Sequence, residues 1–303
     1  MNELLDIYRK DLINFVKNKF NNKEGLINTS IPFLHFYSST TLSEFVSVIY
    51  EPSICIALQG SKAVGFGDDM YGYNESKFLL ASTHVPANVR IEEASVERPY
   101  VSLKITFTLE QIYEVLREIN EISEKPKRKS DKGLYFDDMN MDLLNPISRL
   151  IKLLDTSQKN IDFLSPFIIK EILYVLLNGN SGEFLKQYVM EGSISNQVVK
   201  IITEIKNNFT QTLNIKEISK KMGISESSLY TNFKKITMLT PIQFQKKLRL
   251  EEAKQMLLNQ NIDATQVAFL VGYESPSQFS REYSRMFGLP PKAHINQLKT
   301  IVI

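Results

Sequence analysis

The 303-residue sequence lacks the residues that would indicate a disulfide-bonded, metal-binding or membrane protein. Its single cysteine, Cys55, excludes an intrachain disulfide framework and any zinc site built from clustered cysteines. The three histidines, His35, His84 and His294, lie far apart and form no ligand pair, so we expect no metal and no cofactor. No apolar run approaches the ~18 residues that a membrane helix needs, and the amphipathic start does not resemble a signal peptide. We therefore expect a cytoplasmic protein without membrane contact.

The composition is that of an ordinary globular protein. Hydrophobic residues make up 43% of the chain and charged residues 23%, which is enough for a core in each half and excludes disordered, collagen-like and coiled-coil classes. At roughly 100–200 residues per domain, the length predicts two domains.

The net charge of +2 conceals an asymmetry between the two halves. From Asn196 to Ile303 there are 15 basic and 8 acidic residues, a net charge of +7, whereas the remainder has 21 basic and 26 acidic residues, a net charge of −5. A basic module beside an acidic one favours contact with a polyanion such as nucleic acid. Because ordinary two-domain proteins show similar charge differences, the motifs must decide whether the chain binds nucleic acid.

The basic half contains an internal repeat at a spacing of 49 to 50 residues. Ile218–Ser225 matches Val267–Ser275, with one residue inserted in the second turn, and Leu229 and Phe233 match residues 50 positions further on. Such a repeat indicates one supersecondary unit used twice. In each copy a short apolar helix ends at a glycine, and a serine then caps a second helix. This pattern is typical of a helix-turn-helix.

A long helix is predicted between the two copies, from Thr240, its cap, to about Asn259. About twenty residues at ~1.5 Å each span ~30 Å, close to the ~34 Å between successive major-groove faces of DNA. One chain could therefore place two recognition helices in adjacent turns of a duplex. The alternative is a helical core without DNA contact, since similar apolar stripes occur in ordinary cores.

The repeat resembles the AraC/XylS family of transcription regulators over roughly 100 residues. The residues that carry the resemblance are Gly272–Tyr283, Phe287–Pro291, Lys247–Ala253 and Met222–Ser225 with Phe233–Lys235. The resemblance implies an all-α DNA-binding domain of two helix-turn-helix subdomains joined by a long helix. It also favours an activator that recruits RNA polymerase, as many members of the family do.

The amino-terminal half resembles the sensor domain that often precedes this module, in Glu51–Gly60 and Pro99–Ile105. The family implies a cupin-like barrel that binds a small-molecule effector and often dimerises. The expected fold class is therefore α+β, with a cupin-like β-barrel and packed helices followed by the all-α module. We expect residues 1–192 to form the sensing and dimerisation domain and residues 193–303 the DNA-binding domain.

Base contacts are expected from exposed residues at the start of the second helix of each copy. They are Ser227, Ser228, Tyr230, Thr231 and Asn232 in the first copy, and Ser277, Gln278 and Arg281 in the second. The family pattern favours all of these except Ser228 and Asn232. Arg281 can pair with guanine and Gln278 with adenine, whereas the first copy departs from the family's more usual Arg and Gln. We therefore expect the second copy to carry more of the direct specificity, or the first to read DNA shape.

Phosphate contacts are expected from basic residues beside the recognition helices and from helix amino termini. The candidates are Lys234, Lys235, Lys246, Lys247 and Arg285. For each lysine, the alternative is a solvated surface charge. Arg249 also lies in this region, but the family pattern favours a buried ion pair over a phosphate contact at its position.

The amino-terminal half is predicted to have strands from about residue 31 to 108 and helices from 109 to 178. Its clearest strands are Ser53–Leu58, Lys62–Phe66, Lys77–Ala81 and Tyr100–Ile105, separated by turn residues. Several short strands of this kind favour a barrel or a sandwich. Apolar stripes at 112–119, 143–154 and 167–177 predict helices that pack on the sheets or form a dimer interface, and residues 124–133 read as a charged loop.

Candidate effector-binding positions are polar or aromatic residues on these strands, although the pattern does not say which point inward. They are Tyr37, Cys55, Phe66, Tyr73, Arg90 and Tyr100. Cys55 lies within an apolar strand, where a cysteine usually packs as a small hydrophobe. The alternative is a thiol that senses electrophiles, although no neighbour in the sequence lowers its pKa.

The leading interpretation is a transcription regulator that binds double-stranded DNA, senses a small molecule and can form a homodimer. A catalytic barrel is one alternative, but no metal triad, Ser-His-Asp set or phosphate loop supports an enzyme. The other is a DNA-binding protein whose amino-terminal half only dimerises.

Overall fold

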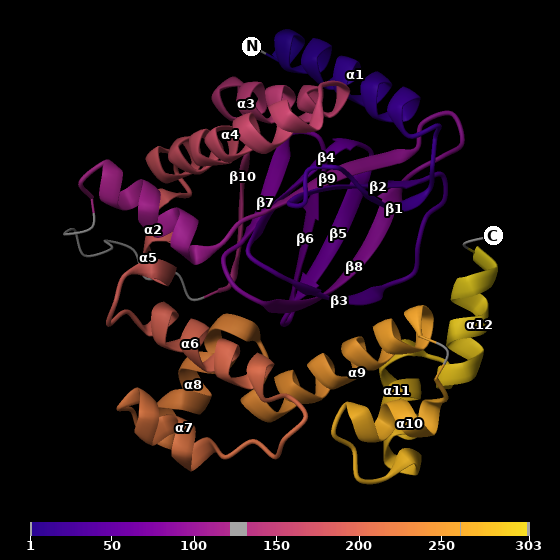
Figure 1. Cartoon of the computed structure of the whole chain (residues 1–303), viewed down its shortest axis with the longest axis vertical. Coiled ribbons are helices and arrows are strands. Elements are labelled where there is room, and N and C mark those ends of the chain that lie inside the picture. The colour runs from indigo at the N-terminus through magenta and orange to yellow at the C-terminus, as the bar shows by residue number, and fades with distance from the viewer. Residues whose placement is uncertain (1, 122–131, 261, 302–303) are drawn as a thin grey trace.

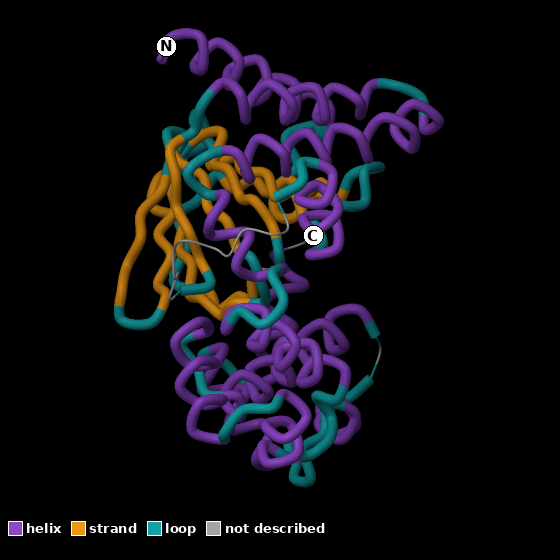
Figure 2. The backbone as a smooth tube through the Cα atoms, turned by 90° about the vertical axis from the view of Figure 1, so that its left-hand side faces the viewer, coloured by secondary structure: helices purple, strands orange, loops and turns teal. Residues whose placement is uncertain are grey.

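The computed structural model describes residues 2–121, 132–260 and 262–301. It has an amino-terminal part of two β-sheets covered by helices, followed by a part made only of helices (Figure 1). The predicted α+β class is confirmed. Seen from the side, the sheets lie between a layer of helices and the carboxy-terminal helices (Figure 2). No helix in the described ranges is long and apolar enough to cross a membrane.

Two antiparallel sheets form the β part, and they do not join into one closed barrel within the described residues. The six-stranded sheet has the order β1-β2-β9-β4-β7-β10 and the four-stranded sheet the order β3-β8-β5-β6. The cupin-like description is therefore approximate. The strands are β1 (Gly25–Asn28), β2 (Leu34–Ser39), β3 (Val46–Tyr50), β4 (Ser53–Gln59), β5 (Ser61–Phe66), β6 (Asp69–Tyr73), β7 (Lys77–Ala81), β8 (Val85–Glu93), β9 (Tyr100–Thr106) and β10 (Leu134–Asp138).

The central strand β4 shows how the core is divided. Its residues alternate between the two faces of the sheet, as in any strand. Ile54 and Ile56 belong to the large hydrophobic core under the helices, whereas Cys55 and Ala57 belong to a second cluster between the sheets. We call this second group the interior cluster, and it consists of Tyr50, Cys55, Ala57, Val64, Phe66, Tyr73, Leu79, Ala81, Val85, Ala87, Val89, Ile91, Tyr100 and Leu134.

Five α-helices pack on the sheets or beside them. They are α1 (Asn2–Lys19), α2 (Leu109–Glu118), α3 (Met141–Lys152), α4 (Gln158–Asn178) and α5 (Gly182–Val189), with a 3-10 turn at Leu153–Asp155. The apolar stripe of α3 is buried as the sequence predicts. In α2, by contrast, Tyr113 is 44% exposed, although the apolar stripe predicted at 112–119 includes it.

The region from 109 to 178, predicted to consist of helices and a charged loop, also contains a strand. Residues 134–138 form β10, the edge strand that pairs with β7. Five residues are too few for a strand pattern to be distinguished from a helix by periodicity, so pairing with β7 decides the conformation. Most of the charged loop predicted at 124–133 lies outside the described residues.

Seven helices form the carboxy-terminal part: α6 (Ile194–Asn207), α7 (Ile215–Met222), α8 (Glu226–Thr237), α9 (Pro241–Asn259), α10 (Ala264–Leu270), α11 (Pro276–Phe287) and α12 (Pro291–Ile301). The repeat appears directly in this order, because α7, α8 and α9 correspond to α10, α11 and α12. The helix α9 runs beneath the sheets and connects the two groups of helices (Figure 1).

The two helical units differ in how they join the rest of the protein. The first unit shares one continuous hydrophobic core with the helices on the sheets, and Leu229, Phe233 and Phe244 belong to it. The second unit has its own core, which includes Phe279 and Tyr283. The first unit is therefore anchored to the amino-terminal part by packing, and the second is a separate body on the other end of α9.

Candidate nucleic-acid interface and sensor cavity

Each helical pair is shaped by caps at its turn. The Ser225 hydroxyl accepts a hydrogen bond from the Ser228 backbone N–H at the start of α8, and Ser275 caps α11 in the same way. Both glycines at the turns have positive φ, +67° at Gly223 and +89° at Gly272, a conformation that costs side-chain-bearing residues energy. Local sequence therefore fixes the two helix-turn-helix pairs.

The first turn of each second helix presents polar side chains to solvent. Ser227 and Thr231 on α8 are exposed, while Ser228, Tyr230 and Asn232 are half-buried. Asn232 donates a hydrogen bond to the Ser228 hydroxyl at 3.1 Å, so these two side chains already contact each other. The side chains that α8 exposes at these positions, Ser227 and Thr231, are small and uncharged.

The matching face of α11 is richer in hydrogen-bonding groups. Ser277, Gln278 and Arg281 are all exposed. Gln278 donates to Glu282 at 3.0 Å, and Glu282 also receives hydrogen bonds from Lys246 at 3.0 Å and from the Tyr273 hydroxyl at 2.9 Å. Although burial opposes ionisation, these bonds lower the pKa of Glu282. Glu282 thus holds Gln278 and Lys246 in place beside Arg281.

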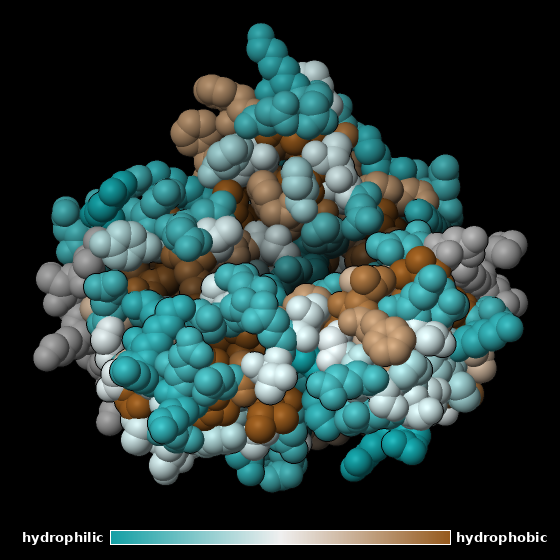
Figure 3. All heavy atoms as spheres, turned by 60° about the horizontal axis from the view of Figure 1, so that its bottom comes forward, coloured by the Kyte–Doolittle hydropathy of each residue, from teal (hydrophilic) through white to brown (hydrophobic). Residues whose placement is uncertain are grey.

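Four of the five phosphate candidates are exposed: Lys234, Lys235, Lys246 and Arg285. The face formed by the carboxy-terminal helices carries hydrophilic side chains over much of its area, with smaller hydrophobic patches (Figure 3). Lys247 is different, because it is half-buried and lies on the same side of α9 as Glu251 and Lys254. Burial lowers the pKa of Lys247 to about 8.

Arg249 has a role that its sequence position did not reveal. Its guanidinium donates to the carbonyl oxygens of Phe209 at 2.6 Å, Gly272 at 2.8 Å and Gln211 at 2.9 Å. The expected partner was an acidic side chain, but these partners are backbone carbonyls. Gln245 also donates to the Phe209 and Gln211 carbonyls. Arg249 therefore ties α9, the α6–α7 loop and the turn of the second unit together.

A cavity of about 410 Å³ opens between the two sheets and α9. Its volume lies within the range of about 300–1,000 Å³ that is usual for small-molecule sites. Strands β2, β3, β4, β5, β6 and β9 contribute to its wall, and Glu251, Lys254 and Gln255 line it from α9. A molecule in this cavity would therefore touch both the sheets and the helix that connects the two helix-turn-helix units. We call it the sensor cavity.

The sensor cavity has an apolar wall with a few charged and polar groups. Lys104 pairs with Glu51 at 2.7 Å, and Lys254 forms an ion pair with Glu251. Lys62 also lines the cavity, and burial lowers its pKa. The polar and aromatic wall residues from the strands are His35, Phe36, Tyr37, Ser47, Tyr50, Cys55, Lys62, Tyr73, Ser102 and Lys104, and Glu51 joins the wall from the turn between β3 and β4.

The structure brings together half of the predicted effector positions. Tyr37, Cys55 and Tyr73 line the sensor cavity, and burial raises the pKa of the Cys55 thiol. Phe66 and Tyr100 lie in the interior cluster but are not part of the cavity wall.

Arg90 lies on the other face of its strand, where it pairs with Glu92 at 2.7 Å and stacks over the Phe45 ring. It therefore does not reach the cavity. Sequence reasoning missed Lys62 and Tyr50, and the signal for Lys62 was its alternation with the apolar Val64 and Phe66.

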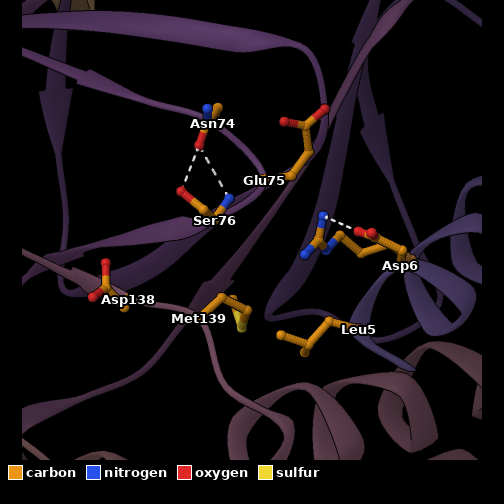
Figure 4. Close-up of a pocket in the computed structure, with 8 residues that line it drawn as sticks. Leu5, Asp6, Asn74, Glu75, Ser76, Asp138 and Met139 are labelled. Carbon is orange, nitrogen blue, oxygen red and sulfur yellow. Dashed lines mark hydrogen bonds and ion pairs between the residues drawn. The ribbon is translucent and has the colours of Figure 1, made fainter. Parts of the chain in front are cut away.

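Another hollow, of about 460 Å³, lies between α1 and the turn that joins β6 to β7 (Figure 4). Its polar groups already contact one another. Asp6 pairs with Arg9 at 3.0 Å, and Asn74 accepts hydrogen bonds from Ser76. It is remote from the helix-turn-helix units, and nothing in its geometry indicates a ligand.

The first helix-turn-helix unit is held against the sheets by specific contacts. The backbone N–H of Gly133 donates to the carbonyl of Ile236 at 3.0 Å, and Met238 packs against the interior cluster. Lys206 donates to His84 at 2.6 Å. Burial and the neighbouring Lys206 lower the pKa of His84 to about 4, so the imidazole is neutral near pH 7 and can accept this bond.

Two family models match the chain. A model described as the AraC-type transcriptional regulator N-terminus matches residues 30–184, and a helix-turn-helix domain model matches residues 218–297. The first match covers half of the chain.

Relatives with curated descriptions match part of the chain. The lactose operon transcription activator of Staphylococcus xylosus is 24% identical over 147 residues, which is 48% of this chain and 52% of that protein. The uncharacterized HTH-type transcriptional regulator YobQ of Bacillus subtilis is 32% identical over 119 residues, 39% of this chain and 49% of that protein. The chain thus spans about half the length of these relatives.

A solved structure shows the same fold over most of the chain. It is ToxT from Vibrio cholerae strain SCE256 with an unsaturated fatty acid bound, at a TM-score of 0.57 and 14% identity. The match covers 86% of this chain and 94% of that one. At this identity the likeness concerns the fold alone.

Proposed function

Since this chain belongs to the family of AraC-type transcriptional regulators, we propose that it is a sequence-specific DNA-binding regulator controlled by a small molecule. In this proposal, residues 1–192 form the sensing and dimerisation domain and residues 193–303 the DNA-binding domain. A regulator of this kind acts in the cytoplasm. The two relatives described above are named as transcription regulators, and we assign no catalytic role.

The observation that carries the DNA-binding proposal is the duplicated helix-turn-helix on a basic module. Helices α8 and α11 have the same length and occupy equivalent places in the two units, and α9 spaces them by 19 residues, or about 28 Å at ~1.5 Å per residue. That length is close to the ~34 Å between successive major-groove faces. Both units could therefore contact one face of a duplex.

Base readout is assigned mainly to α11. Arg281 and Gln278 are exposed there, and Ser277 lies beside them. For bidentate contacts, Arg281 offers two donors and Gln278 offers a donor and an acceptor. On α8, Ser227, Tyr230 and Thr231 contribute contacts or read shape, with Ser228 and Asn232 beneath them. Phosphate contacts are assigned to Lys234, Lys235, Lys246 and Arg285. Lys247 is removed from this set, because it lies on the side of α9 that carries the cavity residues.

The sensor cavity is the proposed effector site. It has a suitable volume, and α9 forms part of its wall. An occupant can therefore change the packing of α9, and with it the relative placement of α8 and α11. The fatty acid in ToxT and the lactose operon activator support a ligand-controlled activator. Recruitment of RNA polymerase and formation of a homodimer complete the proposal.

Mobility-shift titrations of fragmented genomic DNA test the proposal. We expect at least one fragment to bind 10³-fold or more tightly than bulk DNA at physiological salt, as is usual for specific binding. Failure to find such a fragment would refute it.

Two alanine variants test the separate roles. Arg281→Ala should weaken the specific site by about 1–3 kcal/mol and leave bulk DNA binding almost unchanged. Lys234→Ala should weaken both and reduce the salt slope by about 0.9. Equal effects of the two variants on all sequences would contradict the assignment.

A further inference from the structure

The side chain of Lys62 occupies an unusual place for a lysine. On β5 it shares a face with Val64 and Phe66, because residues two apart in a strand point to the same side. Val64 and Phe66 both belong to the interior cluster. Across the sheet, Lys62 is paired with Tyr73 of β6, and both residues line the sensor cavity. The Lys62 side chain thus lies on the face of β5 that borders the cavity, where it is half-buried.

Lys62 differs from the other lysines of the cavity in having no counterion. Lys104 is paired with Glu51 at 2.7 Å, and Lys254 is paired with Glu251. In the described ranges, no carboxylate lies within ion-pair distance of Lys62. Lys62 is half-buried, and a cation withdrawn from water without a counterion is destabilising. The cavity as a whole has one positive charge that its own acidic groups do not neutralise.

A second polar group in the same cavity also lacks a partner. Tyr50 ends β3, belongs to the interior cluster and is 8% exposed. Its hydroxyl is buried and has no hydrogen-bond partner among the described residues. A buried donor that is left unsatisfied costs about 1–3 kcal/mol. Two independent groups in one cavity, a cation and a hydroxyl, therefore require an acceptor that the chain does not supply.

We propose that the effector is a carboxylic acid with an apolar body, whose carboxylate binds Lys62 and accepts a hydrogen bond from Tyr50. This inference rests on the proposed effector function of the cavity. A single negative charge matches the single unpaired lysine, whereas a phosphate dianion would leave charge unneutralised. Val46, Val48 and Leu103 in the same wall provide apolar contacts for the body of the molecule.

Matched acids and amides test the charge requirement. The probes are hexanoate, decanoate and 3-phenylpropanoate, each compared with its primary amide, which has nearly the same shape and no charge. Binding to the full-length protein is measured by calorimetry and thermal shift. At least one acid should bind about tenfold or more tightly than its amide. If every acid binds no more tightly than its amide, the proposal is overturned.

Variants locate the charge within the protein. Lys62→Met keeps the length of the side chain and should weaken the acid on the order of 10–100-fold, the usual effect of a charge-assisted hydrogen bond. Tyr50→Phe should weaken it about 3–10-fold. Lys77→Met is the control, because Lys77 is exposed and pairs with Asp138 on the edge of the other sheet. Acid binding that survives Lys62→Met would refute the assignment.

A further readout shows whether Lys62→Met is simply unfolded. Because the substitution removes an unpaired, half-buried cation, the variant without ligand should melt at or above the temperature of the wild-type protein. A variant that melts well below the wild type is replaced by Lys62→Gln, which retains polarity without charge. Acid binding by folded Lys62→Gln at wild-type affinity would also overturn the proposal.

DNA binding separates this inference from the function on which it rests. Acid binding that depends on Lys62 but leaves DNA affinity unchanged supports the anion site and contradicts the effector role. Stabilisation by uncharged compounds alone, together with altered DNA affinity, supports the effector role and refutes the carboxylate assignment.

Discussion

Substitution of Arg249 tests whether this residue joins the two helix-turn-helix units or contacts phosphate. In Arg249→Ala, three hydrogen bonds from the guanidinium are lost. Gln245 continues to hold the Phe209 and Gln211 carbonyls, so the largest loss falls on the Gly272 carbonyl. With about 1.5–3 kcal/mol for a buried charge-assisted bond and less for exposed ones, we expect a loss of about 2–3 kcal/mol in stability.

Two assays distinguish the roles of Arg249. Urea unfolding is followed by far-UV circular dichroism, since the chain has no tryptophan. Lys246→Ala is the control for stability, because the exposed ion pair between Lys246 and Glu282 is worth about 0–1 kcal/mol. The salt dependence of DNA binding is measured in parallel. If Arg249 only joins the two units, Arg249→Ala leaves the slope of DNA affinity against salt concentration unchanged. A stability loss below about 1 kcal/mol together with a slope reduced by about 0.9 would show a phosphate contact and refute the reasoning.

Two further predictions concern the turn glycines and the contact between the domains. Gly272→Ala should destabilise the protein by about 1–3 kcal/mol more than Gly223→Ala in thermal unfolding. Both glycines have positive φ, but a Cβ at Gly272 would lie 2.8 Å from the Thr210 carbonyl carbon, whereas nothing lies within 4 Å of a Cβ at Gly223. Equal losses of stability would contradict the predicted clash. The pKa of His84 is lowered from its ordinary value of 6.5 to about 4 in the folded protein. As the pH falls, His84 is therefore protonated in the unfolded chain before it is protonated in the folded one, so the free energy of unfolding should fall between about pH 6.5 and pH 4. His84→Gln should flatten this dependence relative to the wild type, and an unchanged profile would show that His84 is not the group responsible.

Local signals in the sequence were sufficient for the helix-turn-helix repeat. Glycine at the end of one helix and serine at the start of the next act on their immediate neighbours, so Ser225 and Ser275 could be identified as caps without knowledge of the fold. The long helix α9 was predicted for the same reason, from Thr240 and Pro241 at its start. These elements depend on contacts within a few residues.

Elements that depend on partners distant in the sequence were harder to predict. The strand β10 exists because Leu134–Asp138 pairs with β7, more than fifty residues earlier. The strand pattern left open whether the strands form a barrel or a sandwich, and within the described residues they form two sheets that do not close. Tyr113 shares the spacing of a buried stripe, yet it is 44% exposed.

The sequence by itself determined the family, the repeated helix-turn-helix unit and the three exposed residues at the start of α11, whereas on α8 only Ser227 and Thr231 of the five expected residues are exposed. Only the tertiary structure decided that Lys62 lines the sensor cavity, that Lys247 is half-buried, and that Arg249 holds backbone carbonyls 23 to 40 residues away. The physical reason is the range of the interactions. Caps and turns act along the chain, whereas a charge is paired, buried or left without a partner only by groups that folding brings to it.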